Sequence, residues 1–226
     1  VLSALKRADL LISGGGSLLQ DVTGRLTIPY YLGIVSMAMM MGKPVMFYAQ
    51  GIGPVNRALG KTLTRLIANR VNMITLRDGS SAELLKRIGV HRPPVEVTAD
   101  PVFGLEIPVG GTGEIYKELG IPSPDKPVTG IFIREWRGLT GYKEALAIMA
   151  DRLAEKGRQV VFVPMQYPED TAPAKAIAGM MKTAPLVIDQ RLTLAQLTGL
   201  VSSMEMVVGM RLHALIIAAS CTVPML

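Results

Sequence analysis

Short apolar runs alternate with helical segments along almost the whole chain, and this alternation restricts the fold more than any other feature. Strand-like runs occur at "ADLLISGGG", "KPVMFYAQ", "NMITLRD", "VEVTADPVF", "VTGIFIREW", "QVVFVPMQ" and "PLVIDQ". Helical segments lie between them, among them "YYLGIVSMAMMMG" and "NRALGKTLTRLIANRV", which carries Leu59, Leu63, Leu66 and Ile67 at helical spacing. Strands that alternate with helices form parallel sheets covered on both faces. The sequence therefore predicts a doubly wound α/β protein.

The alternation is interrupted once, between Gly104 and Pro127, where Gly and Pro are frequent. We therefore predict two Rossmann-like domains, at residues 1–105 and 128–226, joined by a linker at 106–127 with a short helix at "GEIYKELG". The chain opens on what reads as a helix tail, "VLSALKRAD", and closes on what reads as the start of a strand, "TVPML". We expect the first domain to be incomplete at its start and the second at its end.

The amino-acid composition limits which classes of partner and which cellular compartment are expected for this chain. The chain has 24 Lys and Arg against 18 Asp and Glu, so its net charge of +6 favours anionic partners, with an ordinary basic surface as the equal alternative. The single Cys221 excludes a disulfide framework and, with only two histidines, argues against a metal site; an apolar run around it predicts a buried, inert thiol. Basic patches with interleaved aromatics, which nucleic-acid binding favours, are absent. We expect a cytoplasmic protein without a membrane span, because Gly42-Lys43-Pro44 breaks the longest apolar stretch.

Three glycines, Gly14, Gly15 and Gly16, follow the first predicted strand. They do not form a Walker A loop, because no Lys-Ser or Lys-Thr follows, and Leu19 breaks the dinucleotide spacing. In open α/β sheets ligands bind beyond the carboxyl ends of the strands. The glycines therefore indicate a backbone that approaches a ligand, or else a close-packed turn.

Arginines also follow predicted strands: Arg77 in "ITLRD", Arg134 and Arg137 in "IFIREWRG", and Arg211 in "VVGMRLHALI". The planar guanidinium matches carboxylate and phosphate oxygens, so several strand-end arginines suggest a small ligand with two anionic groups. For each arginine alone, a structural ion pair such as Arg77 with Asp78 is an equal alternative.

His213, two residues after Arg211, is a candidate site residue, whereas His91 in "GVHRPP" reads as a solvated loop residue. No G-x-S-x-G nucleophile elbow occurs.

The motifs "LISGGGSLLQD", "VMFYAQGIGPV", "ITLRDGSSAELLKRIGV", "VTADPVF" and "VVGMRLHALIIAA", in this order, resemble the polysaccharide pyruvyltransferase family, closest to its bacterial CsaB type. The family's opening "G-x-x-N-x-G-D" turn has no match here. The resemblance implies a GT-B-like fold with an active site in the interdomain cleft. It also implies pyruvyl transfer from phosphoenolpyruvate to a sugar, with release of phosphate and no other cofactor. In the CsaB type the acceptor is the N-acetylmannosamine of a lipid-linked cell-wall precursor; it becomes a 4,6-ketal, and the polymer anchors S-layer proteins.

Under this resemblance, Arg211, Arg134 and Arg77 would bind the anionic donor, with Arg137 and Leu212 beside them. His213 would deliver a proton to the methylene carbon. The base for the sugar hydroxyl is left open between Asp21, Asp78 and Glu135. The glycines Gly14, Gly15 and Gly16 would form a wall of the cleft on the acceptor side, with Asp21 near them. We expect replacement of Gly15 by Val to abolish activity and leave the fold intact.

Two rival functions are a nucleotide-sugar glycosyltransferase on the same scaffold and a non-enzymatic module that binds anionic glycans, because fold alone does not fix chemistry. A lipid-linked acceptor would place the enzyme at the inner face of the cell membrane. Peripheral membrane association and oligomerisation are left open by the sequence.

Overall fold

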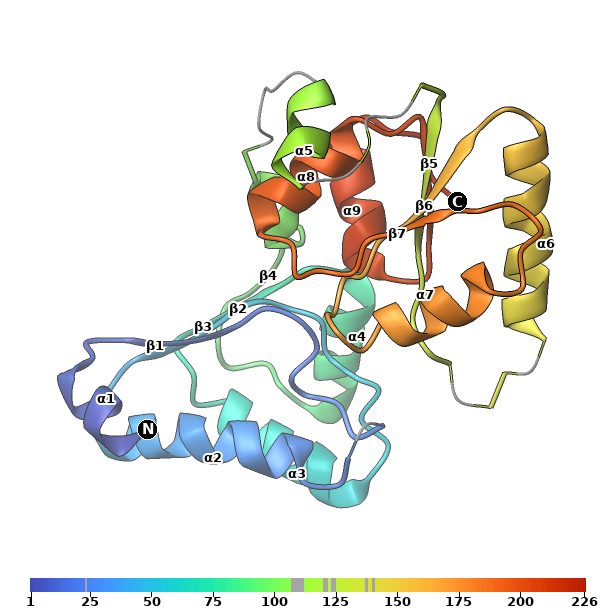
Figure 1. Ribbon diagram of the computed structural model, residues 1–226. Coiled ribbons are helices and arrows are strands. Elements are labelled where there is room, and N and C mark those ends of the chain that lie inside the picture. The colour runs from blue at the N-terminus through green and yellow to red at the C-terminus, as the bar shows by residue number, and fades with distance from the viewer. Residues whose placement is uncertain (23, 107–111, 120–121, 123–124, 137, 140) are drawn as a thin grey trace. The chain divides into compact units, whose positions relative to one another are not determined.

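The computed structural model describes residues 1–226 except 23, 107–111, 120–121, 123–124, 137 and 140. The chain forms two compact units, Val1–Pro101 and Val102–Leu226 (Figure 1). Each is an α/β unit with its own parallel sheet.

The sheet of the first unit has the strand order β1-β2-β3-β4 within the described residues. All three pairings are parallel, as the alternation predicts. The strands are β1 (Leu11–Gly14), β2 (Val45–Gln50), β3 (Met73–Leu76) and β4 (Val95–Val97). The helices are α1 (Leu2–Arg7), α2 (Thr27–Met40), α3 (Ala58–Ala68) and α4 (Gly79–Ile88).

The core of the first unit lies on one face of its sheet. Because the strand order equals the chain order, right-handed crossovers bring successive helices to the same side. Phe47 and Ile74 of the sheet pack there with Leu32 of α2 and residues of the other helices. Side chains that point to the opposite face of the sheet are more exposed to solvent, such as Ile12 (56% exposed) and Tyr48 (45% exposed). Within the described residues, the helices of this unit therefore pack on one face of its sheet.

Helix α3 forms where its apolar spacing predicts, but a different face is buried. Gly60, Thr64 and Ala68 are turned inward, whereas Leu59 and Leu66 are 63% and 52% exposed. The reason is close packing on α2, since a Cβ at Gly60 would lie 3.0 Å from Cδ1 of Ile28. Small residues allow this approach, so Leu59 and Leu66 are left outside, while Leu63 and Ile67 pack partly buried against the core.

The sheet of the second unit has the order β7-β6-β5-β8, also parallel throughout the described residues. Its strands are β5 (Val128–Phe132), β6 (Gln159–Phe162), β7 (Leu186–Val187) and β8 (Met206–Gly209). The 3₁₀ turn η1 (Pro101–Gly104) spans the boundary between the units, and the helices are α5 (Thr112–Glu118), α6 (Tyr142–Glu155), α7 (Thr171–Ala178), α8 (Leu194–Ser202) and α9 (Leu212–Ser220).

The second unit is doubly wound, as predicted. From β5 the chain runs outward through β6 to β7, then returns to place β8 on the other side of β5. One face of the sheet carries a core built with α5, α8 and α9, and the other a core built with α6 and α7. The strand order therefore has a switch point between β5 and β8.

The segment predicted as a linker, 106–127, differs from that expectation in its described part. Helix α5 belongs to the second unit, where Ile115 and Tyr116 are buried in the same core as Leu197 of α8. The hydroxyl groups of Tyr116 and Ser203 lie 3.0 Å apart and share a hydrogen bond. The predicted short helix is therefore present, but it buries Tyr116 in the core of the second unit and is not part of a free linker.

Candidate active site

The carboxyl edge of the second sheet brings several predicted residues together at the switch point. Phe132, near the end of β5, pairs with Gly209, near the end of β8. Arg134 follows the first strand, and Arg211, Leu212 and His213 follow the second, as the sequence predicts. Crevices at such switch points are where open α/β sheets bind ligands.

Arg211 is held in place by Asp170, which begins helix α7. Its Nε donates to Oδ2 of Asp170 at 3.2 Å, its Nη2 pairs with Oδ1, and Nη2 also lies 3.4 Å from Oε1 of Gln166. The Asp170 side chain is 2% exposed and the Arg211 side chain 25%. Asp170 Oδ2 also accepts from the backbone N–H groups of Met165 and Gln166. Among the described residues, the contacts of Arg211 use Nε and Nη2, which leaves Nη1 for a ligand.

His213 lies in the first turn of α9 and is half-buried. Arg211 occupies the N-cap position with an extended backbone, and Leu212 is exposed beside it. The first amide groups of a helix have no intrahelical acceptor and attract anions, more so with a cation beside them. This turn therefore combines an anion-binding helix end, a guanidinium and an imidazole.

The loop after β5 adds a second cation and a carboxylate. The guanidinium of Arg134 lies 5.0 Å from the ring centre of Trp136. Glu135 accepts from Lys143 Nζ at 2.7 Å and from the Tyr142 hydroxyl at 3.2 Å. The predicted residue Arg137 lies outside the described residues.

At the carboxyl edge of the first sheet, Arg77 follows β3 and joins two other loops. Its Nη1 donates to Oδ2 of Asp100 at 2.8 Å and its Nη2 to Oγ of Ser17 at 3.1 Å. Its suggested partner Asp78 instead caps helix α4. The guanidinium lies over Gly51, where a Cβ would come within 2.7 Å of its Nε. Arg77 is thus fixed across the loops that follow β1, β2 and β4.

The three glycines form a tight turn in which Gly14 packs closely, since a Cβ there would lie 3.0 Å from Cβ of Tyr48, whereas Gly15 and Gly16 face open space. Gly15 and Gly16 have φ of +78° and +59°, in the left-handed region that favours glycine. Gly15 N donates to the carbonyl of Tyr48, and the Gly16 carbonyl accepts from Gly51 N. A Cβ at Gly15 or Gly16 would meet nothing within 4 Å. There is therefore room for a side chain at position 15, but the left-handed backbone strains it, so Gly15→Val should also lower stability.

Asp21 and Asp78 are occupied by hydrogen bonds. Oδ2 of Asp21 accepts from the backbone N–H groups of Asn56 and Arg57 at 2.8 and 2.7 Å, and the bond from Arg57 lowers the pKa of Asp21 most. Burial raises the pKa of Asp78, but hydrogen bonds from Ser80 and Ser81 outweigh it, so the pKa is lowered. Both carboxylates position helices, and low pKa values make them weak bases. Glu135 is also held, by Lys143 and Tyr142, and it differs from the other two in following the same strand as Arg134.

Asp170, Gln166, Asp100 and Ser17 are functional candidates that the sequence argument did not single out. All four follow strands, and each contacts an arginine that is distant in the chain. For Asp100 and Asp170 the available signal was an acidic residue soon after a strand, but the arginine partner could be identified only from the folded structure.

No three His, Cys, Asp or Glu side chains converge as metal ligands would in the part of the chain that the structure describes. Burial raises the pKa of the half-buried Cys221 thiol, in agreement with an inert thiol. Over the described ranges, no helix is both long and apolar enough to cross a membrane.

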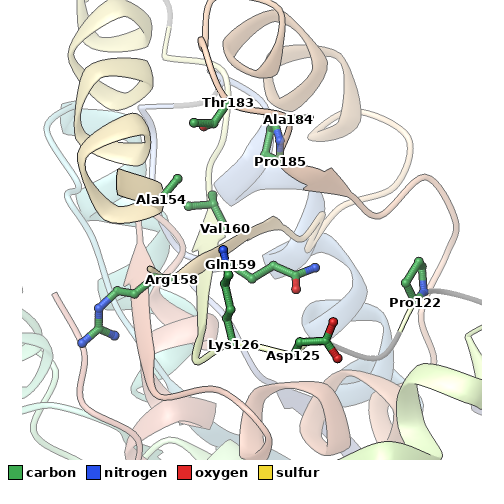
Figure 2. A pocket seen from close by; sticks show the side chains of 10 residues that line it. All are labelled: Pro122, Asp125, Lys126, Ala154, Arg158, Gln159, Val160, Thr183, Ala184 and Pro185. Carbon is green, nitrogen blue, oxygen red and sulfur yellow. The ribbon is translucent and has the colours of Figure 1, made fainter. Parts of the chain in front are cut away.

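A hollow of about 410 Å³ lies at the opposite, amino edge of the second sheet (Figure 2). Lys126 precedes β5, Gln159 begins β6 and Pro185 precedes β7. Parallel α/β sheets bind ligands at the other edge. This hollow is therefore separate from the candidate site.

Solved structures share the fold of this chain. A UDP-GlcNAc 2-epimerase from Neisseria meningitidis bound to UDP-GlcNAc has 16% sequence identity and a TM-score of 0.65, and the match covers 100% of this chain and 62% of that one. A UDP-GlcNAc 2-epimerase from Methanocaldococcus jannaschii has 11% identity and a TM-score of 0.65, with 99% of this chain and 64% of that one covered. HepE from Anabaena in complex with UDP-glucose has 12% identity and a TM-score of 0.62, with 99% of this chain and 60% of that one covered. At such low identity the likeness shows the fold alone, a Rossmann-like α/β fold of the GT-B kind. This chain spans about three fifths of the length of these solved chains.

Two sequence comparisons identify the family. Amylovoran biosynthesis protein AmsJ from Erwinia amylovora is 29% identical over 99 residues, which are 44% of this chain and 23% of that protein. The family model described as polysaccharide pyruvyl transferase matches residues 2–226. These matches reach the family and do not separate the CsaB type from its other members. The chain belongs to the polysaccharide pyruvyl transferase family.

Proposed function

We propose that this protein transfers the pyruvyl group of phosphoenolpyruvate to a sugar of a polysaccharide precursor, forming a 4,6-ketal and releasing phosphate. The observation that carries the proposal is the placement of Arg211 and His213 in one helical turn at the switch point of the second sheet, in a chain of this family.

The donor carries a phosphate and a carboxylate, and both need cations or oriented amides when they leave water. In the proposal, Nη1 of Arg211 and the first amide groups of α9 bind the phosphate. Asp170 holds the guanidinium in position through Nε and Nη2. Arg134 is exposed on the neighbouring strand end and would bind the carboxylate, with Arg137 as a further cation.

His213 would supply the proton that the reaction requires. The methylene carbon of phosphoenolpyruvate gains this proton and becomes a methyl group, while the first sugar hydroxyl adds to the adjacent carbon. The second hydroxyl then forms the other bond to that carbon, and phosphate leaves with the bonding electrons. The two hydroxyl protons balance the proton gained by carbon and the one that leaves with phosphate or solvent. General acid catalysis of this kind contributes roughly 10²–10⁴-fold.

Glu135 is the proposed base for the attacking hydroxyl, because it follows the same strand as Arg134 and thus lies beside the proposed donor site, whereas Asp21 and Asp78 belong to the first unit. On the acceptor side we propose the glycine turn at Gly14–Gly16 and Arg77. The acceptor proposed is N-acetylmannosamine in a lipid-linked cell-wall precursor, as in the CsaB type, whose polymer would anchor S-layer proteins.

The test is phosphate release from phosphoenolpyruvate by the full-length protein, with a synthetic N-acetylmannosaminyl lipid-diphosphate acceptor. We expect acceptor-dependent release that His213→Gln lowers by about 10²-fold or more. His91→Gln is the matched control, because His91 is exposed in a loop of the other unit. In D₂O the ketal methyl group should contain one deuterium by mass spectrometry. Release that His213→Gln does not change would exclude this histidine as the acid, and no release would refute the reaction.

A nucleotide-sugar glycosyltransferase is the second candidate, and one observation favours it: solved structures with this fold include ones bound to UDP-glucose and UDP-GlcNAc. The two functions differ in the donor. Transfer of a sugar from a nucleotide-sugar donor to the same acceptor, without consumption of phosphoenolpyruvate, would select this second candidate.

A further inference from the structure

The net positive charge of the protein comes from its first unit, and the second unit is formally neutral. Residues 1–101 contain 12 Lys and Arg and 6 Asp and Glu, whereas residues 102–226 contain 12 of each. Within the first unit, residues 22–77 carry seven basic side chains and no acidic one. This segment contains helices α2 and α3 and strands β2 and β3.

The same two helices present apolar side chains to solvent. Helix α2 has no charged residue in 14 positions, and its outward residues Tyr30 and Met40 are 62% and 79% exposed. Helix α3 turns Leu59 and Leu66 outward for the packing reason given above. We call these four residues the α2–α3 face. A surface helix ordinarily carries its polar residues on the outside, so this pattern requires a partner.

Two hollows flank this face at the two ends of the helix pair. The first, of about 310 Å³, is lined by Leu26, Pro29 and Leu59 with Arg25 and Arg57, and by Asp21, whose carboxylate is held by backbone amides. The second, of about 490 Å³, is lined by Met39, Met40 and Ile67 with Lys43 and Arg70. Apolar surface is thus accompanied by cations at both ends of the helix pair. Lys61 and Arg65 add two exposed cations along α3.

We propose that the α2–α3 face docks onto an anionic lipid bilayer, with its apolar side chains in the interface and its cations on the lipid phosphates. Interfacial helices combine apolar and basic residues in this way, and each cation near an anionic membrane contributes to binding. A second copy of the chain is disfavoured, because a two-fold interface would place the same basic surface against itself. The inference rests on the surface of the first unit and not on the chemistry proposed above.

Vesicle co-sedimentation of the full-length protein tests the proposal. We expect binding to vesicles of phosphatidylcholine mixed with phosphatidylglycerol, and much weaker binding to phosphatidylcholine alone. The triple variant Lys43→Gln, Lys61→Gln, Arg70→Gln should weaken binding on the order of 100-fold, at about fivefold for each cation. The matched control Arg152→Gln, Lys156→Gln, Arg191→Gln removes three exposed cations from the second unit and should bind as the parent does.

The apolar contribution is tested separately with Leu59→Ser and Leu66→Ser, which replace side chains that are already exposed and should leave the fold unchanged. We expect both to weaken vesicle binding. Equal losses in the charge variant and its control would refute a localised surface. Vesicle binding unchanged by all these variants would refute docking through this face. Sedimentation of the parent as a concentration-dependent dimer that Leu66→Ser dissociates would assign the face to self-association instead.

Discussion

The pair formed by Arg211 and Asp170 should stabilise the second unit as well as orient a candidate catalytic group. Asp170 is almost fully buried, and its partners are the guanidinium and two backbone amides. Replacing Arg211 by Met keeps most of the side-chain volume and leaves a buried carboxylate without its counter-ion. Two charge-assisted hydrogen bonds are worth roughly 1.5–3 kcal/mol each, and desolvation of the pair offsets part of this. We expect Arg211→Met to lower the free energy of unfolding by about 2–4 kcal/mol.

The assay is urea unfolding followed by the fluorescence of Trp136, the only tryptophan, which lies in the second unit. With a slope of about 2 kcal/mol per molar, the midpoint should fall by about 1–2 M. Arg152→Met, at an exposed position of helix α6, is the matched control and should have nearly the parent midpoint.

A double-mutant cycle with Asp170→Asn separates the pair from other effects of either substitution. We expect a coupling energy of about 1.5–3 kcal/mol. A coupling energy under about 0.5 kcal/mol, or a parent-like midpoint for Arg211→Met, would refute the argument that this pair joins the loops after β6 and β8. The result also bears on kinetics, because a loss of activity in Arg211→Met is informative only at urea concentrations and temperatures where the variant is folded.

Two further predictions follow from individual contacts. Gly51→Ala should displace the Arg77 guanidinium, because its Nε would lie 2.7 Å from the new Cβ. A crystal structure of the variant should show Arg77 separated from Asp100 or Ser17. An unmoved guanidinium would contradict the close approach. The pKa of Asp151 is lowered, chiefly by the hydrogen bond from Lys182 N, so its stabilising effect is present above the unfolded-state pKa of about 4 and is lost as pH falls through the folded value. Urea midpoints between ~pH 3 and ~pH 7 should therefore fall less steeply with acid in Asp151→Asn than in the parent, and parallel profiles would contradict this assignment.

The order of elements could be predicted from the sequence because each is encoded locally. Gly89 closes α4 in a left-handed conformation, and the apolar runs before Gly14 and Gly209 form strands. The placement of candidate residues at carboxyl edges follows from the same reasoning, since parallel strands share that edge.

The partners of the site residues could not be predicted from the sequence, because they depend on contacts between residues that are distant in the chain. Arg77 pairs with Asp100 rather than with its neighbour Asp78, and Arg211 pairs with Asp170 from another loop. The apolar spacing of α3 predicts a helix but not that glycine and alanine would form its buried face. That outcome is determined by how closely α2 approaches. Helix α5 could be predicted from its sequence, but its packing against α8, far along the chain, could not.

The switch point between β5 and β8 has a consequence for how the second unit is made. Strand β5 is buried along its whole length, yet its neighbour on one side comes from residues 206–209, far later in the chain. During synthesis, β5 can pair with β6 while its other edge still presents unpaired backbone groups. Such edges are templates for pairing with other chains, and long-range parallel pairing is slow. Until β8 is added, the nascent chain is therefore exposed to misassembly, and the turn that carries Arg211 and His213 is completed in the same step that closes this edge.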